Sequence, residues 1–187
     1  MAQPARPLRA DAARNRERVL QVAWETFAAE GLSVPIDEIA RRAGVGTGTV
    51  YRHFPSKDDL VRAIIADRLQ QVIDEGHALL QSGDPGEALF SFLRSVVFEW
   101  GVTDLGLKAA VDGSDVKVRI KGVRDGFLGI LDELLCAAQQ AGTARTDINA
   151  RHVKTLVVGC QAMHAHDNKA SKQAIEVVFD ALRAPST

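Results

Sequence analysis

The sequence predicts an all-α protein, with a small helical domain near the N-terminus and a larger helical domain after it. In one segment after another, apolar residues recur three and four positions apart, which places them on one face of a helix. Glycine, proline and Asp-Gly pairs separate these segments, as expected for turns between helices. The 187 residues are 46% hydrophobic and 25% charged, which is typical of a globular protein with a substantial core.

The N-terminal residues predict a tail followed by a long helix. Residues 1–10 contain two prolines and two arginines and almost nothing to bury, so we expect a flexible arm there. A first helix is expected over about residues 11–30, and Gly31 follows as its terminator. Its buried face is formed by Val19, Ala23 and Phe27.

Two short helices separated by a tight glycine turn come next. The first carries an apolar stripe made of Ile36, Ile39, Ala40 and Ala43. Gly44 follows this stripe, at the position where a left-handed residue ends a helix with the least strain. The second helix is expected from Thr47 to His53, and Pro55 stops it. This arrangement is a helix-turn-helix, a motif whose second helix enters the major groove of DNA.

The second helix of this motif carries side chains suited to binding DNA. If Val50 and Phe54 pack inward, short hydroxyls, a glycine and an arginine that can read guanine face outward. Ser56 is expected to cap the next helix, and a lysine that can contact phosphate follows it. The candidate DNA-binding residues are Thr47, Gly48, Thr49, Tyr51, Arg52, His53 and Lys57.

Residues 19–60 resemble the N-terminal domain of TetR-type transcriptional regulators. The resemblance lies in AWETFAAEG and in IDEIARRAGVGTGTVYRHFPSKDDL, which together fix several helices, the turn and a Tyr-x-His-Phe-x-x-Lys run. It implies an all-helical homodimer with a C-terminal ligand-binding domain, and DNA contacts at the seven residues named above. The chain departs from the family at Val34-Pro35, where a capping Thr or Ser is usual. We expect Pro35 to be the first helical residue instead.

Residues 57–187 are predicted to form a helical domain for effector binding and dimerisation, behind a DNA-binding domain of residues 11–56. Helices are expected at about 57–80, 89–100, 105–111, 120–142, 149–166 and 169–182, with turns at 82–87 and 112–115. The helix at 57–80 is long enough to join the two domains. By analogy with the family, its tilt would couple ligand binding to DNA binding.

Five aromatic or sulfur-containing residues of this domain are candidates for lining an effector pocket. They are Phe90, Phe98, Trp100, Phe127 and Met163, and plain core packing is the alternative for each. The resemblance implies the pocket, and few charges interrupt these helices, so we expect a largely apolar small molecule. Gly122, Gly126 and Gly129 interrupt one helix, where they either allow close packing, leave room for a ligand or loosen the helix.

The last two helices are candidates for a dimer interface. Both carry broad apolar stripes, as a four-helix interface between identical subunits requires. The candidate interface residues are Val153, Leu156, Val157, Cys160, Ile175, Val178, Phe179 and Leu182. Burial of the same stripes in the core of one subunit is the alternative.

Charge is distributed unevenly along the chain, whose net charge is −1. Residues 1–57 carry nine Arg or Lys against six Asp or Glu, a net charge of +3, and the rest carries −4. A basic end on an acidic body fits a protein that touches DNA at one end. Arg14, Arg16 and Arg18 are either DNA-backbone contacts or a solvated face. Residues 1–10 are either a disordered tail or a basic arm that reaches DNA.

The sequence contains no signature of catalysis, a cofactor or a metal site. The glycine-rich turn at 44–48 follows a helix and lacks the Gly-Lys-Ser/Thr of a phosphate-binding loop. His164 and His166 lie on different faces of one helix, so they cannot share a metal ion. The chain lacks an apolar run of membrane-spanning length, its N-terminus does not resemble a signal peptide, and Cys136 and Cys160 fit buried free thiols. We therefore expect a cytoplasmic protein that is not an enzyme, with no membrane partner.

The sequence thus predicts a transcriptional regulator that reads double-stranded DNA. The specific hypothesis is a repressor that binds a near-palindromic operator as a homodimer and is released by a small-molecule effector. The alternative is a helical ligand-binding or scaffolding protein that does not read DNA specifically.

Overall fold

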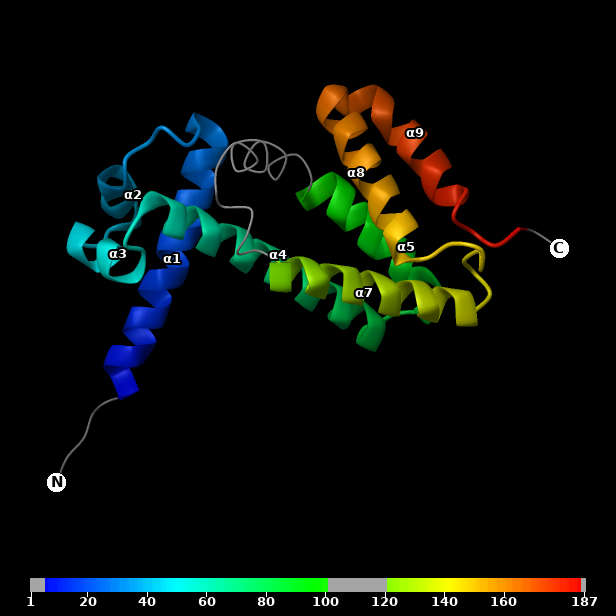
Figure 1. Cartoon of the computed structure of the whole chain (residues 1–187), viewed down its shortest axis with the longest axis horizontal. Coiled ribbons are helices and arrows are strands. Elements are labelled where there is room, and N and C mark those ends of the chain that lie inside the picture. Colours follow the sequence, from blue (N-terminus) through cyan, green and yellow to red (C-terminus); the bar gives the residue numbers. More distant parts are fainter. Residues whose placement is uncertain (1–5, 101–120, 186–187) are drawn as a thin grey trace.

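The computed structural model of the protein describes residues 6–100 and 121–185. In these residues every regular element is a helix, so the predicted all-α fold is confirmed (Figure 1). The elements are α1 (Arg6–Glu30), α2 (Ile36–Ala43), α3 (Thr47–His53), α4 (Lys57–Ser82), α5 (Pro85–Ser95), the π-helix η1 (Val96–Trp100), α7 (Lys121–Gln140), α8 (Ala150–His166) and α9 (Asn168–Asp180). Among the helices of these residues, none combines the length and the apolar composition of a membrane-spanning segment.

The largest difference from the expected helix boundaries is at the N-terminus. α1 begins at Arg6, so the second half of the predicted flexible arm is helical. Pro7 falls in the first turn of this helix, where the missing amide hydrogen removes no intrahelical hydrogen bond. The proline is therefore compatible with a helix start and did not mark a flexible segment. The helix expected at 105–111 and the turn at 112–115 lie outside the described residues.

The described residues form two hydrophobic cores that share α4. We call the described residues 6–69 the head and the described residues from 70 onward the body. In the head, α1, α2, α3 and the first half of α4 bury their apolar faces together, and Ile64 is part of this core. In the body, Ile73 of α4 belongs to a core that also contains side chains of α5, α7, α8 and α9. The core of the head thus extends past the boundary predicted at residue 56, and α4 runs through both parts (Figure 1).

α5 lies in the interior of the body. Its fully buried side chains are Leu89, Phe90, Phe92 and Leu93. Asp84 caps the helix by accepting a hydrogen bond from the Gly86 N–H at 2.8 Å, and Pro85 is the first helical residue. These two residues determine where the helix begins.

The C-terminal residues are fastened to α5. Arg183 donates hydrogen bonds of 2.7 and 3.0 Å to the Glu87 carboxylate, and its guanidinium lies 4.0 Å from the centroid of the Phe90 ring. The Ala184 N–H donates to the Thr143 carbonyl at 2.9 Å. An ion pair, a ring contact and a backbone hydrogen bond therefore hold the residues after α9 against the rest of the body.

α4 and α7 approach each other closely at two glycines. A Cβ atom added to Gly76 of α4 would overlap Cγ1 of Ile130, and one added to Gly126 of α7 would lie 3.0 Å from Cδ1 of Ile73. Gly126 thus serves close helix packing, one of the alternatives considered for the glycines of this helix. No atom lies within 4 Å of a Cβ added to Gly129, so packing does not explain that glycine.

We expect Gly76→Ala to destabilise the protein, because the new methyl group must displace Ile130 in a packed core. Overpacking of this kind costs roughly 1–3 kcal/mol, and each kcal/mol lowers the Tm of a chain of this size by about 2–4 °C. Gly129→Ala is the matched control, because it adds the same methyl group to an exposed helix position and should stabilise by roughly 0.5–1 kcal/mol. Thermal unfolding followed by circular dichroism measures both. Equal effects of the two substitutions would contradict the close approach.

Candidate nucleic-acid interface

The turn between α2 and α3 is built around Gly44. Its φ of 66° lies in the left-handed region, as expected for the residue that ends α2. The Gly44 N–H donates to the Arg41 carbonyl at 3.2 Å, and the Val45 N–H donates to the Ala40 carbonyl at 3.1 Å. α3 then begins at Thr47, so the predicted boundaries of the helix-turn-helix are confirmed.

α2 begins without a side-chain cap. Pro35 is the N-cap residue, and the expectation that it would be the first helical residue is wrong by one position. Its carbonyl accepts hydrogen bonds from the N–H groups of Glu38 and Ile39 at 3.2 and 3.3 Å. Asp37 and Glu38 place negative charge in the first turn, where the helix dipole favours it. Negative charge therefore stabilises the start of α2, where the family usually has a capping hydroxyl.

The outer face of α3 carries most of the residues that the sequence predicts to bind DNA. Val50 is fully buried and Phe54 nearly so, which confirms that these two side chains hold α3 against the head. Of the seven candidates, Thr47, Gly48, Tyr51, Arg52 and His53 are exposed, and Thr49 and Lys57 are half-buried. Tyr51 leaves 45% of its surface exposed although it is large and aromatic. α3 thus presents polar groups that the folded head does not need for its own packing.

The N-terminus of α4 adds a capped helix start beside α3. The Ser56 hydroxyl oxygen accepts a hydrogen bond from the Asp59 N–H at 3.1 Å, which confirms the predicted cap. The same hydroxyl donates to the Asp59 carboxylate at 2.6 Å. This hydrogen bond is the main cause that lowers the pKa of Asp59, and the hydrogen bond from Arg62 is the second. The Lys57 ammonium lies 5.6 Å from the centroid of the Phe27 ring. Lys57 therefore holds a positive charge next to a rigid helix terminus.

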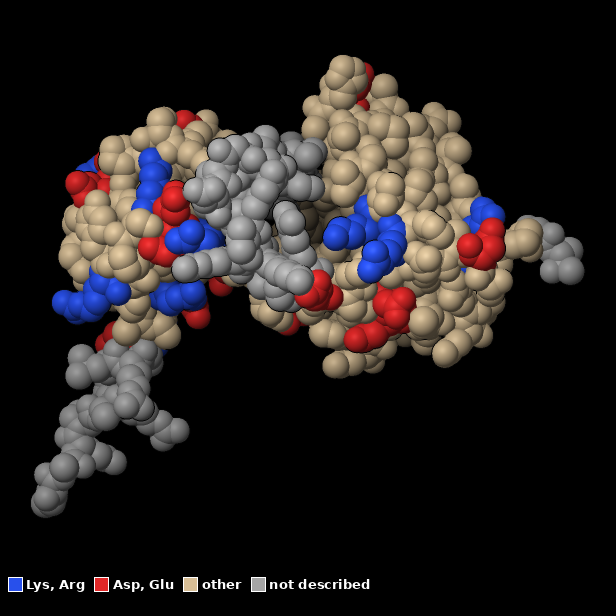
Figure 2. Space-filling view, in the orientation of Figure 1, with Lys and Arg blue, Asp and Glu red and all other residues tan. Residues whose placement is uncertain are grey.

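Basic side chains gather along the edge of the head near α1 and α3 (Figure 2). Arg52 forms no ion pair with any acidic residue that the structure describes, so its charge is available to another molecule. Arg41 and Arg42 differ from it, because both pair with carboxylates of the head. Free and paired arginines thus lie within a few residues of each other in the motif.

Arg42 ties α2 to the end of α1. It bonds to the Glu30 carboxylate of α1 and, at 2.6 Å, to the Glu38 carboxylate of its own helix. Arg41 also donates to Glu38, at 2.7 and 2.8 Å. These hydrogen bonds, from Arg41 and then Arg42, lower the pKa of Glu38 to about 2. Two arginines and two carboxylates therefore set the orientation of α2 against α1.

This network predicts a pH-dependent contribution to stability. Because folding lowers the pKa of Glu38 from 4.5 to about 2, the contribution is complete above about pH 4.5 and is lost as the pH falls towards 2. Glu38→Gln should therefore lower the midpoint of urea unfolding at neutral pH, and this difference should shrink on acidification. Asp37→Asn removes a charge of the same turn that forms no ion pair with the described residues, so this control measures the interaction with the helix dipole alone. A constant difference across this pH range would contradict the role of the Glu38 charge.

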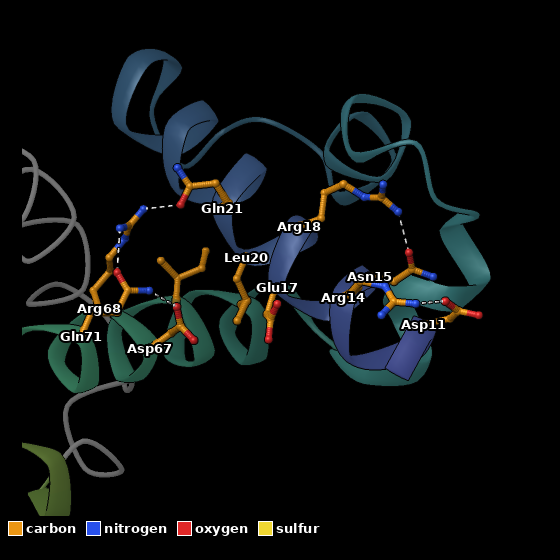
Figure 3. Close-up of a pocket in the computed structure, with 11 residues that line it drawn as sticks. Asp11, Arg14, Asn15, Glu17, Arg18, Leu20, Gln21, Asp67, Arg68 and Gln71 are labelled. Carbon is orange, nitrogen blue, oxygen red and sulfur yellow. Dashed lines mark hydrogen bonds and ion pairs between the residues drawn. The ribbon is translucent and has the colours of Figure 1, made fainter. Parts of the chain in front are cut away.

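A polar groove of about 990 Å³ runs between α1 and α4 (Figure 3). Its lining comes from Asp11, Arg14, Asn15, Glu17, Arg18, Leu20 and Gln21 of α1 and from Ile64, Asp67, Arg68 and Gln71 of α4. Most of its polar side chains bond to one another across or along the groove. Arg68, for example, donates to Gln21 at 2.7 Å and to Gln71 at 3.0 Å.

Arg68 also connects the head to the body. Its guanidinium lies 4.7 Å from the ring centroid of Trp24 in α1 and 5.8 Å from that of Trp100 in η1. The Trp100 ring N–H donates to the Glu75 carboxylate of α4 at 2.9 Å. Residues 24, 68 and 100 are far apart in the sequence, so no local pattern pointed to this contact. The structure thus brings a cation and two indole rings together at the junction of the two parts.

The five candidate pocket residues have different surroundings. Phe90 is fully buried and covered by Arg183, as in core packing, the alternative considered for each of the five residues. Met163 is exposed, with 37% of its surface accessible. Phe98 packs edge-on against the buried ring of His164 at 5.2 Å, and Phe127 packs against Phe92 at 6.2 Å. Phe98, Trp100 and Phe127 are partly buried at the margin of the body core and remain candidates.

The apolar stripes of α8 and α9 are largely internal. Val153, Val157, Cys160, Ile175, Phe179 and Leu182 are each at most 3% exposed and belong to the core of the body. Their side chains pack inside one subunit, which is the alternative considered for these stripes, and their role in a subunit interface stays a prediction. Of the eight candidates, Leu156 is exposed and Val178 is half-buried. Cys136 is also exposed, contrary to the expectation of a buried thiol.

Some apolar side chains of α8 and α9 face outward, and Leu156 is the predicted interface residue among them. Among the described residues, the exposed large hydrophobic side chains are Tyr51, Leu156, Val158, Met163 and Val177. Four of these five lie on α8 and α9, and Val177 leaves 63% of its surface exposed. Exposed apolar surface concentrated on one helix pair is typical of a protein–protein contact.

Two family models match the chain, one in the head and one in the body. Residues 19–64 match the family described as bacterial regulatory proteins, tetR family. Residues 84–184 match the family described as transcriptional regulator SbtR-like, C-terminal domain. The two matches together cover the helix-turn-helix and most of the body.

Curated relatives are similar over about a third of the chain. The HTH-type transcriptional regulator SrpR of Pseudomonas putida is 43% identical over 65 residues, which cover 34% of this chain and 30% of SrpR. An HTH-type transcriptional regulator of Staphylococcus aureus (strain USA300) is 35% identical over 79 residues, which cover 38% of this chain and 43% of that protein. The chain thus spans less than half the length of these curated relatives.

Solved structures are similar over almost the whole chain. A TetR transcription regulatory protein from Mycobacterium vanbaalenii is 50% identical, with a TM-score of 0.81, and the match covers 95% of this chain and 100% of that one. The TetR transcriptional regulator SCO0520 from Streptomyces coelicolor is 27% identical, with a TM-score of 0.78 and coverage of 91% and 99%. A Saccharomonospora viridis protein crystallised in complex with choline is 19% identical with a TM-score of 0.74, over 93% and 100%, and shares the fold alone.

Proposed function

Because the chain belongs to the TetR family of bacterial regulators and is a DNA-binding transcriptional regulator, we propose that it is a ligand-responsive repressor. It binds a near-palindromic operator as a homodimer and leaves the DNA when a small molecule binds the body. The main support for the proposal is the exposed polar face of α3, the helix that follows the glycine turn at Gly44. The protein acts in the cytoplasm and has no catalytic role in this proposal.

Each subunit inserts α3 into one major groove. The short side chains at Thr47, Gly48 and Thr49 let the N-terminal end of the helix approach the bases closely. Arg52 forms paired hydrogen bonds with a guanine, and Tyr51 and Lys57 contact phosphates on either side. The ring of Tyr51 and the helix terminus at Lys57 hold these donors in position, so the contacts require little rearrangement of the head.

Two subunits associate through the outward apolar side chains of α8 and α9. This contact places two α3 helices on one face of the duplex, about one helical turn or a multiple of it apart. The support for it is the exposed side chains of Leu156 and Met163, which lie on one face of α8, and of Val177 on α9. A two-fold axis between the subunits then requires an inverted repeat in the operator.

The ligand acts through α4, the helix that the two cores share. A largely apolar small molecule binds at the margin of the body core, where Phe98, Trp100 and Phe127 are partly buried. Two of these residues lie in η1, and π-helical turns often occur at functional sites. A shift of η1 moves Trp100 against Arg68, which also contacts Trp24 of the head. The contacts of Arg68 support this route between ligand and DNA.

The proposal is tested by selecting binding sites from a random pool of duplex DNA with the purified protein at about physiological salt. We expect enrichment of an inverted repeat, bound by two subunits, and this repeat then serves as the probe in a screen for small molecules that release the protein. No enrichment by a folded, dimeric protein would contradict specific DNA reading. That outcome would favour the alternative, a helical ligand-binding or scaffolding protein.

A further inference from the structure

Three arginines lie close together in the first half of α1, and their surroundings differ. Arg14 forms an ion pair with Asp11, and Arg18 donates a hydrogen bond to the side chain of Asn15. Both arginines line the polar groove between α1 and α4 (Figure 3). Their donors are thus engaged, at least in part, by neighbouring side chains of the same helix.

Arg16 occupies the other side of α1. It is two residues from Arg14 and from Arg18, which corresponds to a rotation of about 200° around the helix, and it is absent from the groove lining. Its guanidinium lies 5.8 Å from the centroid of the Phe54 ring. Phe54 directly follows the last residue of α3, so Arg16 extends beside the C-terminal end of that helix.

The charge of Arg16 has no acidic partner in the head. It is exposed, and no carboxylate of the described residues lies within ion-pair distance of it. The Phe54 ring attracts the guanidinium and holds it near the end of α3. Lys57 is held in the same way over Phe27 at the start of α4. Two cations thus rest on aromatic side chains of the head core, close to the residues that follow α3.

We infer that Arg16 is a further DNA-binding residue, which contacts a backbone phosphate next to the half-site that α3 reads. A guanidinium can bind two phosphate oxygens at once, and the backbone contacts of a helix in the major groove fix its register. The inference rests on the proposed DNA-binding function and adds a residue outside the helix-turn-helix. Arg14 and Arg18 have no such role, because they face the groove between α1 and α4.

The test compares Arg16→Ala, Arg18→Ala and Arg16→Lys with the unaltered protein on the selected operator and on unrelated duplex DNA. Each phosphate contact contributes about 0.9 to the slope of log affinity against log salt, so Arg16→Ala should lower the slope for a dimer by about two. Between 50 and 200 mM salt, the affinity of the unaltered protein should therefore fall roughly tenfold more than that of the variant. The loss should be the same on both DNA sequences. Arg18→Ala should leave the slope unchanged, and Arg16→Lys should retain most of it.

The outcomes separate this inference from the proposed function. If the unaltered protein binds the operator and Arg16→Ala keeps its salt slope, the phosphate contact is wrong and the proposed function stands. If the unaltered protein shows no sequence preference, both are wrong. Thermal unfolding of each variant without DNA measures the structural effect of losing the contact with Phe54 separately, because that contact does not change the salt slope of DNA binding.

Discussion

Replacing Leu156 and Val177 together with aspartate is expected to give a folded monomer that binds its operator far more weakly. Both side chains are exposed in one subunit, so the substitutions disturb little of its core. In a dimer they would lie in an apolar contact, where each buried carboxylate is strongly unfavourable. Loss of the second subunit removes the gain of bivalent binding, so operator affinity should fall by roughly 10²–10⁴-fold.

Sedimentation velocity and operator titration measure the two parts of this prediction. Gln140→Asp introduces the same charge at an exposed position at the end of α7 and should leave both mass and affinity unchanged. A double variant that remains dimeric would show that the subunits associate through another surface. A double variant that is monomeric and binds with full affinity would contradict the coupling of dimerisation to DNA binding.

Arg52→Ala is expected to weaken operator binding and to relax sequence preference at one position of each half-site. A paired hydrogen bond from arginine to guanine is worth about 1–3 kcal/mol of discrimination, or roughly 5- to 150-fold in affinity per half-site. Arg52 is exposed and not paired with any described acidic residue, so the substitution should not affect folding. Titration of the operator and of single-base variants measures the change.

Lys57→Ala provides the contrasting result. A phosphate contact carries no sequence information, so this variant should bind every sequence more weakly and should lower the salt slope by about one charge per half-site. Equal losses on all sequences for Arg52→Ala would assign Arg52 to the DNA backbone as well. The pair of variants thus separates base reading from backbone binding within a few residues.

The helix-turn-helix could be predicted almost completely because its determinants are local. Gly44 adopts the left-handed conformation that its position required, and Ser56 caps α4 as expected. Val50 and Phe54 are buried, so the outer face of α3 follows from the helical period alone. The seven candidate DNA contacts remain a prediction, since the geometry of the head gives their exposure and not their partners.

The body could be predicted less well because periodicity identifies a buried face without identifying what covers it. The stripes of Val157 and Ile175 are strong, yet they pack inside one subunit, whereas the exposed Val177 belongs to no stripe. Phe90 was indistinguishable from Phe98 by residue type, and only the position of Arg183 separates them. In each of these cases, contacts between residues far apart in the sequence determine which side chains are buried.

The contact between Arg68, Trp24 and Trp100 gives the protein a built-in optical signal. The chain contains only two tryptophans, and both rings lie within 6 Å of the same guanidinium at the junction of head and body. Indole emission depends on the charges and polarity around the ring, so the whole intrinsic tryptophan fluorescence comes from this one junction. A small molecule that changes the angle between body and head should therefore change the emission spectrum without any added dye. A screen for effectors can therefore follow the shift in the protein's tryptophan emission before the operator is known.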